Sequence, residues 1–442
     1  MERSHPRSLD SLAIWHLRRR HSARVFPPAT TVESAPAVKS ALSSLPAIGN
    51  VSPPTLDHWP YGITLIGVGL LSLPYALSQG GWLSLIVFLA IAAISFYTGI
   101  LLQRCIDSSS LVDTYPDIGA HAFGRRGRVI VAAFMYLELY LVAIDFLILE
   151  GDNLHKLFPA ASFRLGALHV RGKQAFVLAA TLVVLPTTWF SSLNVLAYVA
   201  AGGSLASVVL IAGVLWVGVF DGVGFHETGR LVHWAGMPSA MSMYSFCFSG
   251  HAVFPMIYTG MKDRKRFPAV LSVCFTLSTL SYGFIGVIGY LMYGDMLQSQ
   301  ITLNLPSTSV AAKVAIYTTL VNPLTGYALL VAPVAEAAEG ALGVSKSTPL
   351  RALVRTGLVA GTFVVALAVP FFAEVVGLTG ALLSCTVTML LPCLCYLKVR
   401  SKIGGATAMR LETAACLAIV AVGATIVGLG TYSSVKQIVR RL

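Results

Sequence analysis

Long apolar segments separated by short polar connections fill the chain from about residue 58 to its end. Each segment has close to the roughly 20 residues that a helix needs to cross a bilayer. We therefore predict eleven membrane-spanning helices and an all-α polytopic membrane protein. The predicted spans cover residues 59–78, 82–102, 129–149, 174–190, 195–219, 237–261, 269–293, 312–335, 352–370, 373–397 and 411–432.

The first 57 residues differ from the rest of the chain. They carry seven basic residues against four acidic ones, with many Ser and Pro. This composition is typical of a disordered segment, which has little apolar surface to bury. We interpret residues 1–57 as a cytosolic polar tail and residues 58–442 as one transmembrane domain. An organellar transit peptide is the alternative, because such peptides are also rich in Arg and Ser and poor in acidic residues.

Basic residues predict the orientation of the spans. With the N-terminus inside, the inside segments hold 22 Lys and Arg and the opposite side holds 9. Cytosolic loops of membrane proteins carry such an excess of basic residues. The sequence therefore predicts a cytosolic N-terminus and, after eleven crossings, a C-terminus on the other side.

Composition supports the membrane interpretation and excludes other classes. Hydrophobic residues make up 56% of the chain and charged residues 11%, against about 25% charged residues in soluble proteins. The net charge of +12 comes from short basic runs between apolar segments, so it does not indicate a nucleic-acid partner. The seven Cys follow neither a disulfide framework nor a metal-binding spacing, and we expect no metal or cofactor.

Enzyme motifs are incomplete. Residues 226–230 begin like HExxH, but Arg230 stands where the second metal-binding His is required. The phosphate-binding pattern GxxxxGK[ST] does not occur in the sequence, so we do not expect ATP to drive the protein directly. These observations favour a secondary transporter or a binding protein over an enzyme.

Two predicted spans contain helix breakers at mid-depth. The first span has Gly67, Gly69 and Pro74, and the sixth has Gly250 and Pro255. Gly permits non-helical backbone and Pro removes a hydrogen-bond donor, so both segments can unwind. Unwound backbone at membrane depth is tolerated where it is buried in protein or lines a cavity. Close packing of helices is the structural alternative for these residues.

The breaks lie in spans one and six, five helices apart, as in transporters with two five-helix inverted repeats. In such proteins the discontinuous helices meet at the substrate site. Free N–H groups suit a carboxylate and free C=O groups suit an ammonium, so the zwitterion of an α-amino acid matches a broken helix. The candidate substrate-binding residues are Thr64, Gly67, Val68, Gly69, Ser249, Gly250 and His251.

Four segments carry a family resemblance. They are residues 63–82, 147–154, 248–255 and 322–329, and together they resemble the amino acid/auxin permease family, most closely its plant vacuolar amino acid transporter branch. The resemblance implies the leucine-transporter type of fold and proton-linked movement of amino acids, typically across the vacuolar membrane. We expect neutral amino acids as the substrates. The resemblance also implies a Lys in the eighth span where this chain has Gly326, so the choice between protons and sodium stays open.

Ionisable and polar residues within the spans are candidates for coupling. Glu138 and Asp145 are seven residues apart and share one face of the third span. His251 follows the break in the sixth span, and imidazole titrates between the pH of the cytosol and that of an acidic lumen. Asn322 and Thr325 offer neutral oxygens on the eighth span. The structural alternatives are a static hydrogen bond for Glu138, a neutral cap for His251 and helix-to-helix hydrogen bonds for the others.

The sequence thus predicts a secondary amino acid transporter, with protons as the expected coupling ion. An amino-acid sensor with little flux is the alternative from another class. A carrier of auxin or another carboxylate is the alternative within the transporter class, because a helix N-terminus accepts any carboxylate.

Overall fold

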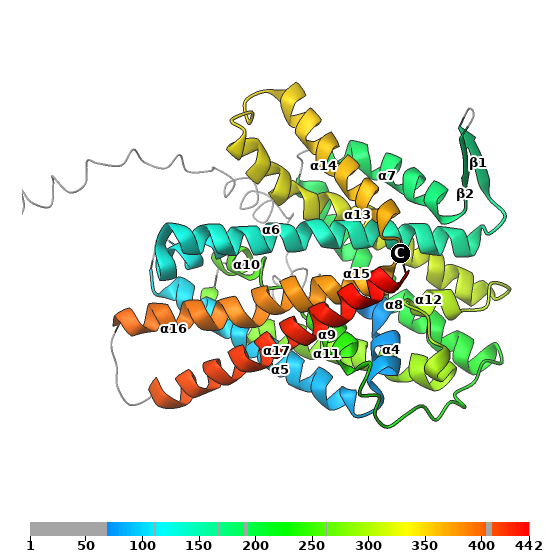
Figure 1. Cartoon of the computed structure of the whole chain (residues 1–442), viewed down its shortest axis with the longest axis horizontal. Helices are drawn as coiled ribbons and strands as arrows, with labels where there is room; N and C mark the ends of the chain where they lie inside the picture. The colour runs from blue at the N-terminus through cyan, green and yellow to red at the C-terminus, as the bar shows by residue number, and fades with distance from the viewer. Residues whose placement is uncertain are drawn as a thin grey trace, which may run out of the picture.

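The computed structural model describes residues 69–109, 112–165, 168–189, 193–261, 263–403 and 409–441. The predicted tail, residues 1–57, lies outside this range. The first described helices are α4 (Gly69–Gly80), α5 (Ser84–Asp107), α6 (Tyr115–Leu157), α7 (Lys173–Trp189) and α8 (Leu193–Phe220). Between α6 and α7, strands β1 (Ser162–Leu165) and β2 (Leu168–Arg171) form an antiparallel hairpin in which Ser162 pairs with Arg171. We call the end of the molecule that carries this hairpin the hairpin end (Figure 1).

The second half of the described chain is helical throughout its spans. Its main helices are α9 (Met237–Cys247), α10 (Phe254–Gly260), α11 (Phe267–Tyr293), α13 (Val310–Ala341), α14 (Thr348–Ala368), α15 (Phe372–Leu378), α16 (Leu391–Ile403) and α17 (Met409–Arg441). Short 3-10 helices lie at Arg264–Arg266 and Gly294–Met296, and α12 covers Ile301–Asn304. Two π-helical segments, η3 (Thr379–Ser384) and η4 (Thr386–Leu390), join α15 to α16.

These helices confirm the predicted spans from the second to the eleventh. Within the described residues, seven helices are long and apolar enough to cross a membrane, and the other predicted spans correspond to shorter or partly described helices. The sixth span consists of two helices, α9 and α10, and the ninth and tenth separate between Ala368 and Phe372, as predicted around Pro370. In the first span the described helix runs from Gly69 through Pro74, so the prediction of a break at Pro74 is wrong; the residues before Gly69 lie outside the described range.

The third span is longer than predicted because α6 begins at Tyr115 and not near residue 129. Thr114 caps the helix: its hydroxyl accepts from the N–H of Asp117, whose carboxylate accepts from the Thr114 N–H at 3.1 Å. Gly124 has φ of 69° and changes the direction of the helix, a conformation that glycine adopts without strain. The polar residues 115–128 therefore form a capped helical extension.

The helices form two groups that match the inverted-repeat architecture. One group consists of α6, α7, α13 and α14, which pack against one another. The other contains α4, α5, α9, α10 and α11. Figure 1 shows α6 crossing the whole length of the molecule, with α13 and α14 on one side and α16 and α17 on the other. The candidate site lies where α6 faces the break between α9 and α10.

A buried ionic cluster ties the first group together. Nε of Arg355 lies 2.7 Å from Oε1 of Glu339, and both side chains are almost fully buried. Arg351 contacts the other carboxylate oxygen at 3.0 Å, and Arg355 also donates to the carbonyl of Thr188 at 2.7 Å. The cluster therefore joins α13, α14 and α7.

Candidate functional site

The break in the sixth span meets the start of α4. Helix α9 ends at Cys247 and the chain becomes helical again at Phe254. A Cβ built on Gly69 would lie 2.8 Å from Sγ of Cys247, and the Cys247 thiol donates to the Gly69 carbonyl at 3.5 Å. The structure thus brings the first and sixth spans together at the predicted breaker positions. Thr64, Gly67 and Val68 lie outside the described residues.

Glu138 faces this break from α6. Its side chain is buried, with the residue 4% exposed, and the hydroxyls of Ser249 and Ser384 lie next to its carboxylate. Within the described part of the chain, Oε1 of Glu138 has no hydrogen-bond partner. The carboxylate therefore connects three elements: α6, the sixth-span break and η3.

The π-helical segment of the tenth span contributes polar groups that the sequence analysis missed. The hydroxyls of Thr379, Ser384 and Thr388 are buried and have no hydrogen-bond partner among the described residues. A Cβ on Gly380 would lie 2.0 Å from the Ser242 carbonyl, so the absence of a side chain there lets η3 approach α9 closely. π-Helical turns occur often at functional sites. The sequence signal was Thr, Gly and Ser residues interspersed among apolar ones at positions 379–388.

Asp145 is the most deeply buried acidic residue on this face of α6. It is 0% exposed, and neither carboxylate oxygen has a hydrogen-bond partner in the described chain. Seven residues of α-helix place it about 10.5 Å along the axis from Glu138, toward the hairpin end. An isolated buried charge is costly. The Asp145 carboxyl group is therefore expected to be protonated unless a cation binds next to it.

His251 lies against α5. Its Nε2 is 3.0 Å from the Ser95 carbonyl oxygen and 3.0 Å from Oγ1 of Thr98, and its ring lies 4.7 Å from that of Phe254. Because a carbonyl can only accept, Nε2 carries a hydrogen. Nδ1 has no hydrogen-bond partner within the described residues. The His251 ring thus bonds the break to α5, a geometry that agrees with the structural alternative of a cap on backbone groups.

We therefore expect His251→Gln to preserve the pH profile of uptake, because Gln keeps a donor for the Ser95 carbonyl. His251→Ala should lower uptake at every pH, since it leaves this buried group unpaired at a cost of about 1–3 kcal/mol. Initial uptake rates measured over a pH series check both variants. A flattened pH profile for His251→Gln would contradict this expectation and would indicate that His251 carries the coupled proton.

Asn322 and Thr325 lie on α13. Asn322 lines a small cavity between α4, α8 and α13, next to Leu70 and Thr319. The Thr325 hydroxyl donates to the Val321 carbonyl of its own helix at 2.6 Å. The structure thus brings Asn322 near the start of α4, whereas the hydroxyl hydrogen of Thr325 is used locally.

A network of hydrogen bonds and one ion pair joins α12 to α6 at the hairpin end. Gln300, which precedes α12, accepts from Asn153 at 2.7 Å and donates to Asp152 at 3.1 Å. Asp152 also pairs with Lys173 at 2.6 Å, and Lys173 donates to the Pro370 carbonyl at 2.6 Å. Helix α12 packs against both α4 and α6. We call this arrangement the α12 closure.

A broken helix, a facing buried carboxylate and two packed helix groups define a secondary membrane transporter as the class of protein. The chain matches the family model described as transmembrane amino acid transporter protein over residues 63–436. The chain therefore belongs to the transmembrane amino acid transporter family.

Relatives support this assignment over most of the chain. Amino acid transporter AVT1I of Arabidopsis thaliana is 46% identical over 377 residues, which cover 85% of this chain and 92% of the relative. Amino acid transporter AVT1J of the same plant is 45% identical and covers 85% and 89%. These relatives are named as transporters and not as enzymes.

Solved structures show the same fold. MhsT, solved in complex with L-phenylalanine, superposes with a TM-score of 0.55 and 12% identity, covering 87% of this chain and 100% of that one. A manganese transporter from Eremococcus coleocola gives a TM-score of 0.50 at 12% identity, covering 89% and 99%. The predicted all-α fold of the leucine-transporter type is thus confirmed.

The contact between Gly69 and Cys247 leads to a prediction. Gly69→Leu should abolish transport while the protein still inserts into the membrane, because the new side chain would push α4 away from the break. Gly357→Leu is the matched control, since a Cβ at this α14 position meets nothing within 4 Å. Uptake normalised to the amount of protein in vesicles measures the effect. Near-normal flux in Gly69→Leu would contradict the assignment of the start of α4 to the substrate site.

Proposed function

We propose that this amino acid transporter is driven by protons and moves amino acids, neutral ones in the first instance, across the vacuolar membrane. The observation that carries the proposal is the meeting of the start of α4, the break after Cys247 and the buried carboxylate of Glu138. The names of the relatives and the family resemblance of the four sequence segments support amino acids as the substrate.

The sixth-span break offers a helix end to one charge of an amino acid. The C-terminus of α9 at Cys247 carries partial negative charge. We infer that the substrate lies in the break beside Ser249 and Gly250, with its ammonium toward this helix end.

Glu138 is the group that we assign to proton coupling. The hydroxyls of Ser249 and Ser384 lie beside it; a carboxylate can only accept hydrogen bonds from them, whereas a neutral acid can also donate one. Protonation of Glu138 therefore changes the hydrogen bonds that α6 can form with the break and with η3. A proton that binds the two conformations of the carrier with different affinity shifts their populations.

Uptake into proteoliposomes tests the proposal. The purified protein is supplied with labelled neutral amino acids, charged amino acids and auxin, with and without a pH gradient, and with sodium replaced by a large organic cation. We expect concentrative uptake of neutral amino acids that requires the pH gradient and not sodium. Binding without flux would instead indicate a sensor, and preference for auxin would indicate a carboxylate carrier.

A strict sodium requirement would contradict the role of Glu138 and shift attention to the cavity lined by Asn322. The vacuolar assignment is tested separately, by the position of a fluorescent fusion of the full chain relative to a vacuolar membrane marker. Fluorescence confined to the plasma membrane would overturn it.

A further inference from the structure

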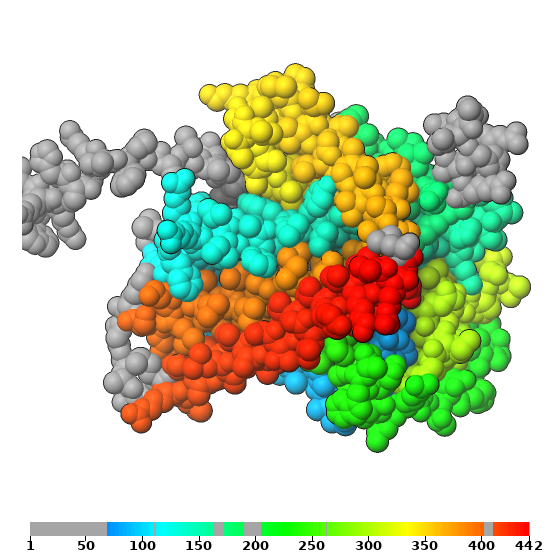
Figure 2. Space-filling view, viewed as in Figure 1, coloured from blue at the N-terminus to red at the C-terminus, as the bar shows by residue number. Residues whose placement is uncertain are grey.

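A groove runs along α17 on a surface that takes no part in the candidate site. It has a volume of about 770 Å³ and lies between α17 and Leu382 of the neighbouring η3 segment. Its walls are almost entirely apolar, and Val435 and Val439 are exposed in it by 43% and 68%. Figure 2 shows α17 running across one face of the molecule, next to α16.

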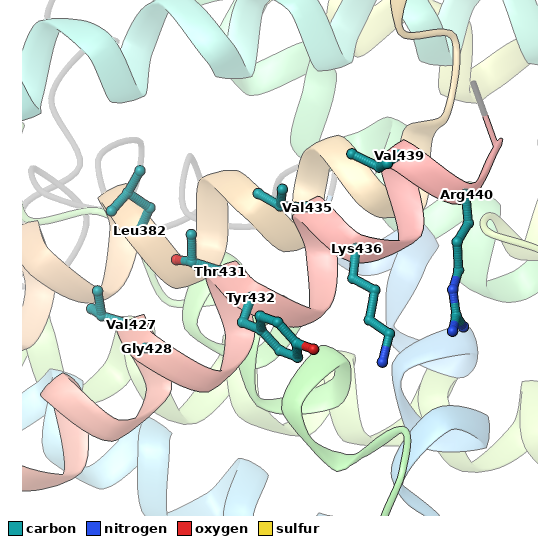
Figure 3. Close-up of a pocket in the computed structure, with 9 residues that line it drawn as sticks. All are labelled: Leu382, Val427, Gly428, Thr431, Tyr432, Val435, Lys436, Val439 and Arg440. Carbon is teal, nitrogen blue, oxygen red and sulfur yellow. The ribbon is translucent and has the colours of Figure 1, made fainter.

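Three amphipathic side chains lie along one side of the groove. Figure 3 shows Tyr432, Lys436 and Arg440 leaving α17 on the same side. Lys436 and Arg440 are four residues apart on the helix, so their cationic ends are neighbours. The Lys436 ammonium lies 5.4 Å from the centre of the Tyr432 ring.

The two cations have no acidic partner among the described residues. The nearby carboxylate of Glu374 is 3.0 Å from Arg441 instead. Aromatic and basic side chains at the end of a spanning helix lie at the level of lipid head groups. The groove therefore has two positive charges without an acidic partner along its apolar wall.

We propose that this groove binds an anionic phospholipid. The phosphate would lie between Lys436 and Arg440, where two cations face one negative charge, and one acyl chain would lie along Val435, Val439 and Leu382. A zwitterionic lipid fits the apolar wall equally well, but its own ammonium opposes the two cations. Charge complementarity thus favours an anionic head group in the leaflet at the hairpin end.

Native mass spectrometry of the purified full-length protein tests this site. Dioleoylphosphatidylglycerol and dioleoylphosphatidylcholine are titrated separately, and the fraction with one bound lipid is measured. We expect tighter binding of the anionic lipid, and a loss of roughly 30-fold in its affinity for the double variant Lys436→Ala with Arg440→Ala, because each basic residue contributes about 1 kcal/mol. Affinity for phosphatidylcholine should stay unchanged.

Two controls separate the explanations. The charge-retaining double variant Lys436→Arg with Arg440→Lys should bind the anionic lipid like the parent. Glycerol 3-phosphate, which has the charge without the acyl chains, should not compete, and Val439→Trp, which fills the groove, should weaken both lipids. Equal affinity of the parent for the two lipids, or unchanged binding of the anionic lipid by the double Ala variant, would overturn the proposal. Competition by glycerol 3-phosphate would do so as well, since it would show a free-anion site.

Discussion

Glu138→Gln should abolish concentrative uptake while leaving exchange of substrate across the membrane intact. Gln keeps the size of the side chain and offers an acceptor and a donor to the neighbouring hydroxyls of Ser249 and Ser384, but it cannot take up or release a proton. One proton moved per substrate down a pH gradient of one unit drives about tenfold accumulation, and the variant should show none. Accumulation and counterflow of a labelled neutral amino acid in proteoliposomes measure the two properties separately.

The same helix offers a matched control. Glu150 is also buried and its carboxylate also lacks a hydrogen-bond partner in the described chain. It lies twelve residues from Glu138, about 120° around the helix, so it faces another direction. Glu150→Gln should keep concentrative uptake. Full accumulation by Glu138→Gln would show that the proton travels by another route, with Asp145 the next residue to replace.

Arg355→Met should cause the largest loss of stability of any single change considered. It would leave Glu339 buried without its partner at 2.7 Å and remove the donor to the Thr188 carbonyl. Removing one member of a buried ion pair typically costs about 3–5 kcal/mol. We expect a lower melting temperature in detergent and reduced amounts of protein in the membrane.

Arg351→Met removes the same charge from the same cluster. Its side chain is 31% exposed, and exposed pairs contribute only about 0–1 kcal/mol. Its melting temperature should therefore stay close to that of the parent. Equal losses in the two variants would show that the total charge of the cluster matters and not the burial of Arg355.

The membrane spans could be predicted because each segment must be apolar to lie in lipid, and this requirement is visible in the local sequence. The extent of α6 was not, since residues 115–128 are polar and their helix depends on the cap formed by Thr114 and Asp117. The pattern of apolar residues along the chain does not reveal such a helix cap. The division of the sixth span was predictable, because Gly250 and Pro255 are local signals.

The partners of the candidate residues depend on tertiary packing. The sequence indicated Glu138 as a buried acid, but the position of Ser384 beside it follows from the π-helical path of the tenth span. His251 was singled out by its place after the break, yet its contacts with Ser95 and Thr98 come from α5. These contacts join residues that are far apart in the sequence, and no local sequence pattern specifies them. The direction in which each side chain points could therefore not be predicted.

The α12 closure has a consequence for the local stability of the hairpin end. Helix α12 has four residues, and helices this short have almost no stability of their own in water. Its order therefore depends on packing against α4 and α6 and on the bonds between Gln300, Asn153 and Asp152. Local release of α12 should therefore require less free energy than global unfolding. Amide hydrogen exchange at residues 301–304 should consequently be faster than exchange in the long helices that pack beside it.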